Sequence, residues 1–204
     1  MDANDWNTRY AESDRVWSDD PNGALVRHAP TPGGGRLALD LGCGEGADAL
    51  WLARAGWQVI GVDWAGVALD RARAAAASTG ATASFVEGDI TDAAGLASLS
   101  PSGRFDLITL AYVHPEPEQR ATVYRHLPGL VAPDGYLLVI AHDPEHGARG
   151  LPGPQAHRLM STDDMLAALD LPADFEVMVR DIWRRGSSAD VHALDSVVLA
   201  HRLG

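Results

Sequence analysis

Residues 37–46 read LALDLGCGEG: an apolar run ends in an acidic residue and a turn of alternating glycines. A helical pattern follows over residues 46–55, so this stretch predicts a buried strand, a tight turn and a helix. Glycines let the backbone of such a turn approach a ligand closely at the mouth of a parallel sheet. Gly42, Gly44 and Ala47 also satisfy the G-x-G-x-x-[G/A] pattern of dinucleotide sites. The turn by itself therefore fits more than one kind of cofactor.

Acidic residues at the ends of three successive predicted strands narrow the choice of cofactor. Asp40 would repel the pyrophosphate of a dinucleotide, but it can accept a hydrogen bond from an ammonium group. Asp63 suits a ribose diol, which either cofactor carries, and Asp89 can accept a hydrogen bond from the exocyclic amine of adenine. S-adenosylmethionine (SAM) carries a sulfonium and an ammonium and no phosphate, so the acidic pattern favours SAM over a nicotinamide dinucleotide. The alternative is that these aspartates only cap helices.

Strand-like and helix-like segments alternate along the chain, which is typical of a parallel sheet with helices on both faces. Strands are predicted over residues 36–41, 57–63, 81–89, 105–112, 135–142, 175–183 and 191–202. Helices are predicted over residues 46–55, 66–78, 92–99 and 117–130, and after a cap at residues 161–164. The last two strands should form a hairpin, so one strand should run antiparallel to the rest. We therefore expect an α/β, Rossmann-like fold with a mostly parallel seven-stranded sheet and an antiparallel C-terminal hairpin strand.

The chain shows no repeat or low-complexity linker, so we expect one domain over residues 1–204. Residues 1–30 would form an N-terminal helical cap segment. Residues 143–160 are rich in Gly, Pro and His and predict a loop on the substrate side of the sheet. Arg184 and Arg185, in the turn between the last two strands, are most simply solvated charges.

Composition excludes some classes of partner. Of the 204 residues, 46% are hydrophobic and 22% are charged, as in ordinary globular proteins. The net charge of −12 makes nucleic acid a poor partner, and no apolar run is long enough to span a bilayer. The single cysteine, Cys43, fits a reducing compartment, and the polar N-terminus is unlike a signal peptide. The use of Arg without Lys indicates a GC-rich bacterial genome. We expect a cytoplasmic protein and leave its oligomeric state open.

The motifs ALDLGCGEGADALWLARAGWQVIGVD, EGDI, FDLITLAYVH and LVAPDGYLLVIAH, in this order, resemble those of class I SAM-dependent methyltransferases. The resemblance extends to WNTRYAESDRVWSDDPNGALV near the N-terminus and to STDDMLAAL later in the chain, and so covers most of it. It is closest to the branch that includes the tellurite-resistance methyltransferases. The resemblance implies SAM as cofactor and S-adenosylhomocysteine as product.

The resemblance also implies roles for individual residues. The methionine moiety would be lined by Gly42 and Gly44, with Cys43 between them, and Asp40 would face its amino group. The ribose hydroxyls would bind Asp63. The remaining contacts would be Asp89 and Ile90 at the adenine, Trp64 against the adenine or ribose face, Ala111 near the methionine end, and Tyr10 and Trp17 as walls of the methionine end or the acceptor pocket.

Several of these residues have a simpler interpretation. Cys43 could be reactive at a helix N-terminus, but packing under the turn is favoured. Tyr10 and Trp17, with Trp6, approximate a helical stripe that more often packs on the domain than binds a ligand. Ala65 stands where relatives often carry a Ser or Thr helix cap, a loss of about 1 kcal/mol.

Candidate catalytic and substrate residues follow the fourth and fifth predicted strands. Tyr112 and His114 should project into the crevice, where His114 could act as a general base or could simply be a loop histidine. His142 ends the fifth strand and could contact substrate. The acidic and histidine residues between 142 and 157 match no recognised series of metal ligands, so we expect no metal.

We therefore expect transfer of a methyl group from SAM to a small-molecule acceptor, by in-line displacement at the methyl carbon. A thiol, selenium or tellurium acceptor would need no base, whereas an oxygen or nitrogen acceptor would give His114 more importance. Two alternatives are a module that binds SAM without transferring methyl, and an NAD-dependent oxidoreductase.

Overall fold

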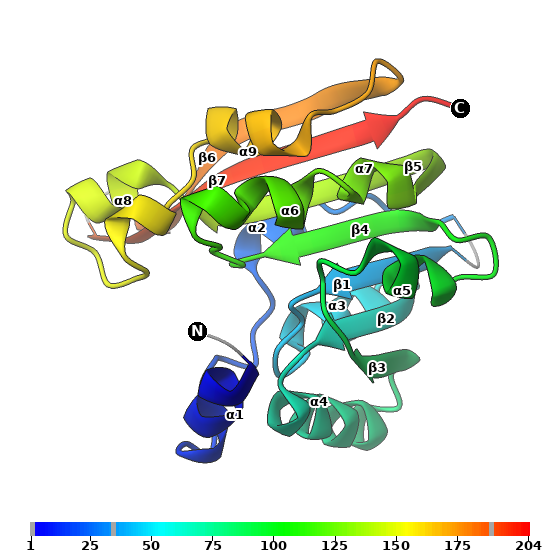
Figure 1. The fold of residues 1–204 in the computed structure, drawn as a ribbon. Helices are drawn as coiled ribbons and strands as arrows, with labels where there is room; N and C mark the ends of the chain where they lie inside the picture. The colour runs from blue at the N-terminus through cyan, green and yellow to red at the C-terminus, as the bar shows by residue number, and fades with distance from the viewer. Residues whose placement is uncertain (1–2, 34–35, 188–189) are drawn as a thin grey trace.

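A computed structural model describes residues 3–33, 36–187 and 190–204. Within these residues the strands form one seven-stranded sheet of order β3-β2-β1-β4-β5-β7-β6 (Figure 1). The strands are β1 (Leu37–Leu41), β2 (Gln58–Asp63), β3 (Ala83–Glu87), β4 (Phe105–Ala111), β5 (Val131–His142), β6 (Phe175–Ser187) and β7 (Asp190–Arg202). Strands β1 to β5 pair in parallel, and β7 is antiparallel to both β5 and β6. This confirms the predicted sheet and hairpin. Strand β6 continues through residues 184–187, which were predicted to form the turn, so Arg184 and Arg185 lie on a strand. Residues 188–189 lie outside the described residues.

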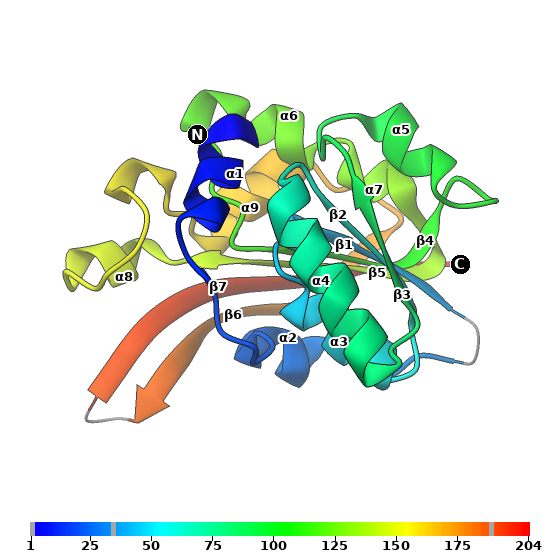
Figure 2. The ribbon, with the colours of Figure 1, turned by 90° about the horizontal axis from the view of Figure 1, so that it is seen from below.

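Helices cover both faces of the sheet (Figure 2). One face carries α2 (Gly23–His28), α3 (Ala47–Arg54) and α4 (Gly66–Thr79). The other carries α5 (Ala93–Ser98), α6 (Arg120–Tyr124), α7 (Leu127–Leu130) and α9 (Thr162–Leu169). Helix α4 turns small side chains to the sheet, so it can pack closely; they include Ala72 and Ala76, whereas Ala68 packs with Tyr10. The central strands β1 and β4 are buried between the two layers, as their near-continuous apolar sequences predict.

The carboxyl ends of the parallel strands meet at one edge of the sheet. The strand order reverses between β1 and β4, and in such sheets ligands bind in the crevice at this reversal. Two segments flank this edge: α1 (Ala3–Ala11), in blue, and α8 (Pro144–Ala148), in yellow, lie on the side to which the arrowhead of β4 points (Figure 1).

The helix predicted over residues 117–130 is broken into a 3-10 turn (Pro117–Gln119), α6 and α7. Pro128 explains the second break, because it has no N–H to donate to the carbonyl of Tyr124 and its ring crowds that carbonyl. Residues 132–135 interrupt the pairing of β5 with β4 after Val131, and Asp134 takes a positive φ of 58° there.

The segment 143–160 is not a plain loop, which corrects the sequence prediction. It contains α8 and a second 3-10 turn (Ala156–Arg158). The side chain of Asp143 accepts a hydrogen bond from the backbone N–H of Glu145 at 2.8 Å, and Pro144 occupies the first helical position. These are ordinary signals for the start of a helix, and the many glycines and prolines that follow conceal them.

Candidate cofactor and acceptor site

The glycine turn after β1 has a backbone that only glycine adopts readily. Gly42, Gly44 and Gly46 have φ values of 69°, 51° and 86°. An L side chain in this left-handed region costs about 1–2 kcal/mol per residue. At Gly42 a Cβ would also lie 2.7 Å from a methyl group of Val113. The turn therefore brings its backbone close to neighbouring side chains at the carboxyl end of β1, and Gly42 is the glycine of the three that is only half-buried.

Asp40 lies beneath this turn with one oxygen unpartnered. The residue is 2% exposed, and its Oδ1 accepts a hydrogen bond from the hydroxyl of Thr109 at 2.7 Å. Its Oδ2 is buried and has no hydrogen-bond partner among the described residues. Burial, reinforced by the nearby carboxyl of Asp48, raises the pKa of Asp40 to about 8. Burial likewise raises the pKa of Asp48 to about 6, although Asp48 accepts a hydrogen bond from the backbone N–H of Asn22 at 2.6 Å. A ligand ammonium would supply the partner that Asp40 lacks.

Asp63 is oriented by backbone amides from the turn after β1 and from the start of α4. Its Oδ2 accepts from the N–H of Gly44 and its Oδ1 from the N–H of Ala65, each at 2.9 Å. Burial raises its pKa, although these hydrogen bonds oppose the shift. Each oxygen keeps a second lone pair that can accept from a hydroxyl. The carboxyl group thus joins the glycine turn to the start of α4 and can still bind a diol.

The three residues predicted at the adenine lie at a more open part of the edge. Asp89 is exposed, and its Oδ1 accepts from both the backbone N–H and the hydroxyl of Thr91 at 2.8 Å. Ile90 is half-buried against the core, and Trp64 is 38% exposed. Trp64 follows β2, whereas Asp89 and Ile90 follow β3, its parallel neighbour.

The N-terminal segment is held on the glycine turn by Glu45, which the sequence reading missed. Glu45 is 3% exposed and accepts hydrogen bonds from the backbone N–H groups of Val16, at 3.2 Å, and Trp17, at 2.9 Å. Arg71, on α4, pairs with Glu45 at 2.8 Å and donates to the backbone carbonyl of Tyr10 at 2.7 Å. Glu45 and Arg71 are 26 residues apart, so no local pattern relates them.

Tyr10 and Trp17 lie against the glycine turn. The indole N–H of Trp17 donates to the hydroxyl of Tyr10 at 2.8 Å. A Cβ added at Gly44 would lie 3.0 Å from that hydroxyl and 3.6 Å from the indole ring. Helix α1 ends at Ala11, so Trp17 lies beyond it, although its ring centroid is 6.2 Å from that of Trp6.

A second cluster lies where β4 and β5 end. Tyr112, next to Ala111, takes a φ of 57°, which is an outlier for a bulky residue and is typical of a functional site. Its hydroxyl donates to Asp195 of β7 at 2.9 Å. The ring of Tyr112 lies 4.8 Å from that of His142 and 6.2 Å from that of His114.

Asp195 organises this cluster, and the sequence reading did not single it out. It is fully buried, and its carboxylate accepts from the hydroxyl of Tyr112, from Nδ1 of His142 and from Nε of Arg185, each at 2.9 Å. The interpretation of Arg185 as a solvated turn charge was therefore wrong: its guanidinium pairs with a buried carboxylate.

His114 is fixed by a backbone contact. The backbone N–H of His142 donates to its Nε2 at 3.2 Å, which occupies the lone pair that a base would use. Burial, followed by the nearby imidazole of His142, lowers the pKa of His114 to about 4. A catalytic role for His114 stays a prediction, and this geometry does not favour it as a base.

Other features give the site no further chemistry. Burial raises the pKa of the Cys43 thiol, in keeping with the packing interpretation. Among the described residues no group of three or more His, Cys, Asp or Glu side chains could hold a metal ion, and no helix could span a membrane.

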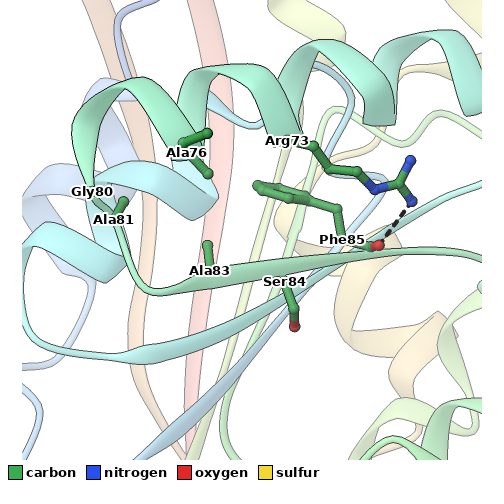
Figure 3. A pocket seen from close by; sticks show the side chains of 8 residues that line it. Arg73, Ala76, Gly80, Ala81, Ala83, Ser84 and Phe85 are labelled. Carbon is green, nitrogen blue, oxygen red and sulfur yellow. Dashed lines mark hydrogen bonds between the residues drawn. The ribbon is translucent and has the colours of Figure 1, made fainter.

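A shallow hollow of about 540 Å³ lies between α4 and β3 (Figure 3). Alanines and glycine make up much of its wall, and the guanidinium of Arg73 donates there to the carbonyl of Phe85.

Comparisons with known proteins agree with this geometry. Residues 38–135 match the family model described as a methyltransferase domain. The ribosomal RNA small subunit methyltransferase C of Alcanivorax borkumensis is 33% identical over 110 residues, which is 51% of this chain and 31% of that protein. The chain spans less than half the length of the curated relatives that it matches.

Solved structures share the fold over more of the chain. A structure titled for the conversion of a disulfide bond into a thioacetal group during echinomycin biosynthesis has a TM-score of 0.76 and 21% identity, covering 99% of this chain and 93% of that one. Magnesium protoporphyrin IX methyltransferase from Synechocystis, with bound S-adenosylhomocysteine, has a TM-score of 0.64 and 20% identity, covering 88% and 78%. The chain is therefore similar to methyltransferases over residues 38–135 and shares their fold over most of its length. None of the relatives named here is a tellurite-resistance methyltransferase, so that branch stays a prediction.

Proposed function

We propose that this protein binds SAM across the carboxyl ends of β1, β2 and β4 and transfers its methyl group to a small-molecule acceptor. The observation that carries the proposal is the unpaired, buried Oδ2 of Asp40 beneath a left-handed glycine turn. An unpaired buried oxygen is costly unless a ligand supplies a donor, and the amino group of SAM is such a donor.

The remaining cofactor contacts follow from the edge of the sheet. Asp63 would bind the ribose hydroxyls with its free lone pairs. Gly42, Cys43 and Gly44 would offer backbone to the methionine moiety, and Ala111 would do so from β4. At the adenine end we place Trp64, Asp89 and Ile90, where the edge is open enough to admit a planar base.

SAM, when bound, supplies a methyl group already activated by the positive sulfur, so the protein needs mainly to align the acceptor and exclude water. Tyr10 and Trp17 are placed to cover the glycine turn from the N-terminal side. We propose that residues 1–30 form the cap over SAM, that residues 143–160 shape the acceptor side, and that the two segments belong to one domain.

A small molecule is the favoured acceptor because of charge. One relative named above is a ribosomal RNA methyltransferase, but this chain carries 16 basic against 28 acidic residues, a net charge of −12. RNA binding relies on clustered cations that meet phosphates. Magnesium protoporphyrin IX methyltransferase, which shares the fold, is named for a small-molecule acceptor. We further propose that the protein works in a bacterial cytoplasm.

Isothermal titration tests the cofactor assignment. SAM and S-adenosylhomocysteine should bind the full chain, and NADH should not. Asp63→Ala should weaken SAM binding by about 1.5–3 kcal/mol, because the charged partner of the ribose hydroxyls is lost. Asp106→Asn is the matched control, since Asp106 binds the backbone N–H of Leu37 at the opposite end of the strands. Saturable NADH binding without SAM binding would overturn the proposal, as would an unchanged affinity in Asp63→Ala.

A further inference from the structure

Three imidazole rings stack where β4 and β5 end. The ring of His142 lies 5.2 Å from that of His114 and 4.4 Å from that of His146, with interplanar angles of 18° and 14°. His114 follows β4, His142 ends β5, and His146 lies on α8. The three side chains are chemically identical, so their hydrogen-bond partners decide what each can do.

The two outer rings are held neutral by backbone contacts. Nδ1 of His146 accepts from the N–H of Leu194 at 3.3 Å, so its Nε2 carries the proton and donates to the carbonyl of Pro152 at 3.0 Å. Nε2 of His114 accepts from the backbone N–H of His142. Burial lowers the pKa of both rings. Neither is arranged to take up a proton.

The central ring has a different partner. Nδ1 of His142 lies 2.9 Å from Oδ1 of Asp195, and a carboxylate can only accept, so Nδ1 carries the proton. Nε2 of His142 therefore has a free lone pair. Within the described residues no hydrogen bond reaches this nitrogen, and the side chain is 14% exposed.

Asp195 is equipped to stabilise a protonated His142. Burial alone would raise its pKa, but the hydrogen bond with His142 and the charge of Arg185 outweigh burial, and the pKa lies below its ordinary value. The carboxylate therefore stays ionised at neutral pH. An ionised carboxylate on Nδ1 holds the ring in one tautomer and orientation, and it can stabilise the imidazolium that forms when Nε2 accepts a proton.

The surroundings of His142 contain charges of both signs. The groups that face it or flank it are Tyr112 and His114 after β4, Asp143 and His146 at α8, Arg185 on β6 and Asp195 on β7. β5 lies directly beside β4, one strand from the reversal where the cofactor is proposed to bind. A base at this position stands beside the expected acceptor pocket.

We propose that His142 is the general base that accepts the proton of a hydroxyl or amine acceptor, and that Asp195 is a positioning residue for it. The inference rests on the proposed function and specifies the acceptor class. The acceptor's oxygen or nitrogen forms a bond to the methyl carbon as the bond from that carbon to sulfur breaks. The electron pair of the broken bond stays on sulfur, and the acceptor's proton passes to Nε2 of His142 and later to water.

Two measurements on the chain without SAM test the free nitrogen. Imidazole ¹⁵N spectra should show His142 as the Nδ1–H tautomer, and Asp195→Asn should raise the share of the Nε2–H tautomer. Asp174→Asn is the matched control, because Asp174 pairs with Arg202 at 2.9 Å at the other end of the hairpin. Diethyl pyrocarbonate should modify His142 before His114 and His146. An Nε2–H tautomer, or faster modification of His114, would overturn the proposal.

Turnover provides the third readout. With SAM and a panel of catechol, tyramine, benzylamine, thiophenol and a dialkyl disulfide, the wild type should methylate a hydroxyl or amine probe. His142→Gln should lose about 10²-fold or more of the methylation rate, while its affinity for SAM stays unchanged. His201→Gln, at the far end of β7, should behave as wild type.

Three results would contradict this expectation. Equal rates in His142→Gln and wild type, or methylation confined to the thiol and disulfide probes, would overturn the inference and leave the proposed function intact. Absence of SAM binding in the wild type would overturn both.

Discussion

The two sides of the β1–β4 reversal hold their polar groups in different ways. The cofactor side comprises the ends of β1 and β2, and the acceptor side comprises the ends of β4 and β5. On the cofactor side, Asp63 accepts from the backbone N–H groups of Gly44 and Ala65, and Asp40 accepts from the hydroxyl of Thr109.

On the acceptor side, Asp195 joins side chains that lie 83 and 53 positions away, Tyr112 and His142. The cofactor side leaves one buried oxygen of Asp40 without a partner among the described residues, whereas both oxygens of Asp195 accept hydrogen bonds. A buried oxygen that lacks a hydrogen-bond donor is suited to bind a ligand. A carboxylate whose two oxygens both accept hydrogen bonds is suited to position a neighbouring side chain.

The largest effect on the cofactor side should come from Arg71→Ala. This change removes the cation from Glu45, whose side chain is 2% exposed, and frees two carbonyls of the N-terminal segment. We expect a loss of about 3 kcal/mol, the low end for breaking a buried pair, because Arg71 is itself 28% exposed. Urea unfolding would measure it. Arg125→Ala, which removes an exposed pair 3.9 Å long, should change stability by under about 1 kcal/mol. Equal losses in the two variants would show that Arg71 and Glu45 do not hold the N-terminal segment on the glycine turn.

Asp40→Asn should separate binding from stability. The neutral amide loses the charge-assisted bond to the SAM amino group, so SAM affinity should fall by about 2 kcal/mol, roughly 30-fold, by titration calorimetry. The folded chain without SAM should gain stability, because a buried carboxylate with a raised pKa is removed. A variant that binds SAM as tightly as wild type would refute the role given to Asp40.

The same residue predicts a pH dependence. The pKa of Asp40 is about 8 in the folded state and near 4 when unfolded, so the folded state binds more protons between these values. Stability without SAM should therefore fall as pH rises from about 4 to about 8. Asp40→Asn should flatten the curve, and Asp48, with a pKa of about 6, should account for part of the remaining slope. Thermal melts across this range would measure it, and an equal slope in both proteins would exclude Asp40 as its source.

On the acceptor side, Tyr112→Phe removes one of the donors to Asp195. We expect a loss of about 1.5 kcal/mol in the free energy of unfolding, the lower end for a hydrogen bond to a charged group, since two donors remain. Tyr136→Phe is the control, because Tyr136, at the other end of β5, stacks on His201 and its hydroxyl makes no hydrogen bond among the described residues. Similar losses in both variants would show that the network adds nothing.

The smallest effect concerns the start of α4. Ala65 cannot cap the helix, but the side chain of Asn7 accepts from the N–H of Val67 at 3.1 Å and so replaces the missing cap from another helix. Asn7→Ala should lose about 1 kcal/mol. In an Ala65→Ser background the loss should shrink, because the serine hydroxyl can accept a hydrogen bond from a backbone N–H of the first turn of α4. A double-mutant cycle by urea unfolding tests this, and strictly additive effects would contradict it.

The sequence predicted most of the fold because strands and helices follow local periodicity. All seven strands and the antiparallel hairpin were predicted correctly. The errors were also local: Pro128 broke a predicted helix, and Asp143 with Pro144 started a helix in a predicted loop. In both places one or two residues outweighed the average composition of the segment.

The residues of the candidate site likewise fall into a group that the sequence predicted and a group that it did not. The positions of Asp40, Asp63 and Asp89 at strand ends followed from the pattern, although their ligand contacts remain proposals. Glu45, Arg185 and Asp195 were missed or misread, since the partners of such residues come from other elements. No spacing rule relates a glutamate after β1 to an arginine of α4, or an arginine of β6 to the ends of β4 and β5.

The sequence by itself determined the glycine turn, the acids around it and the succession of strands along the chain. Backbone conformation and hydrophobic periodicity are properties of neighbouring residues. Only the tertiary structure decided which carboxylate oxygen is left unpaired at Asp40 and which imidazole nitrogen is left free at His142. A lone pair is free or occupied according to every donor within about 3 Å, and those donors come from strands far apart in the chain.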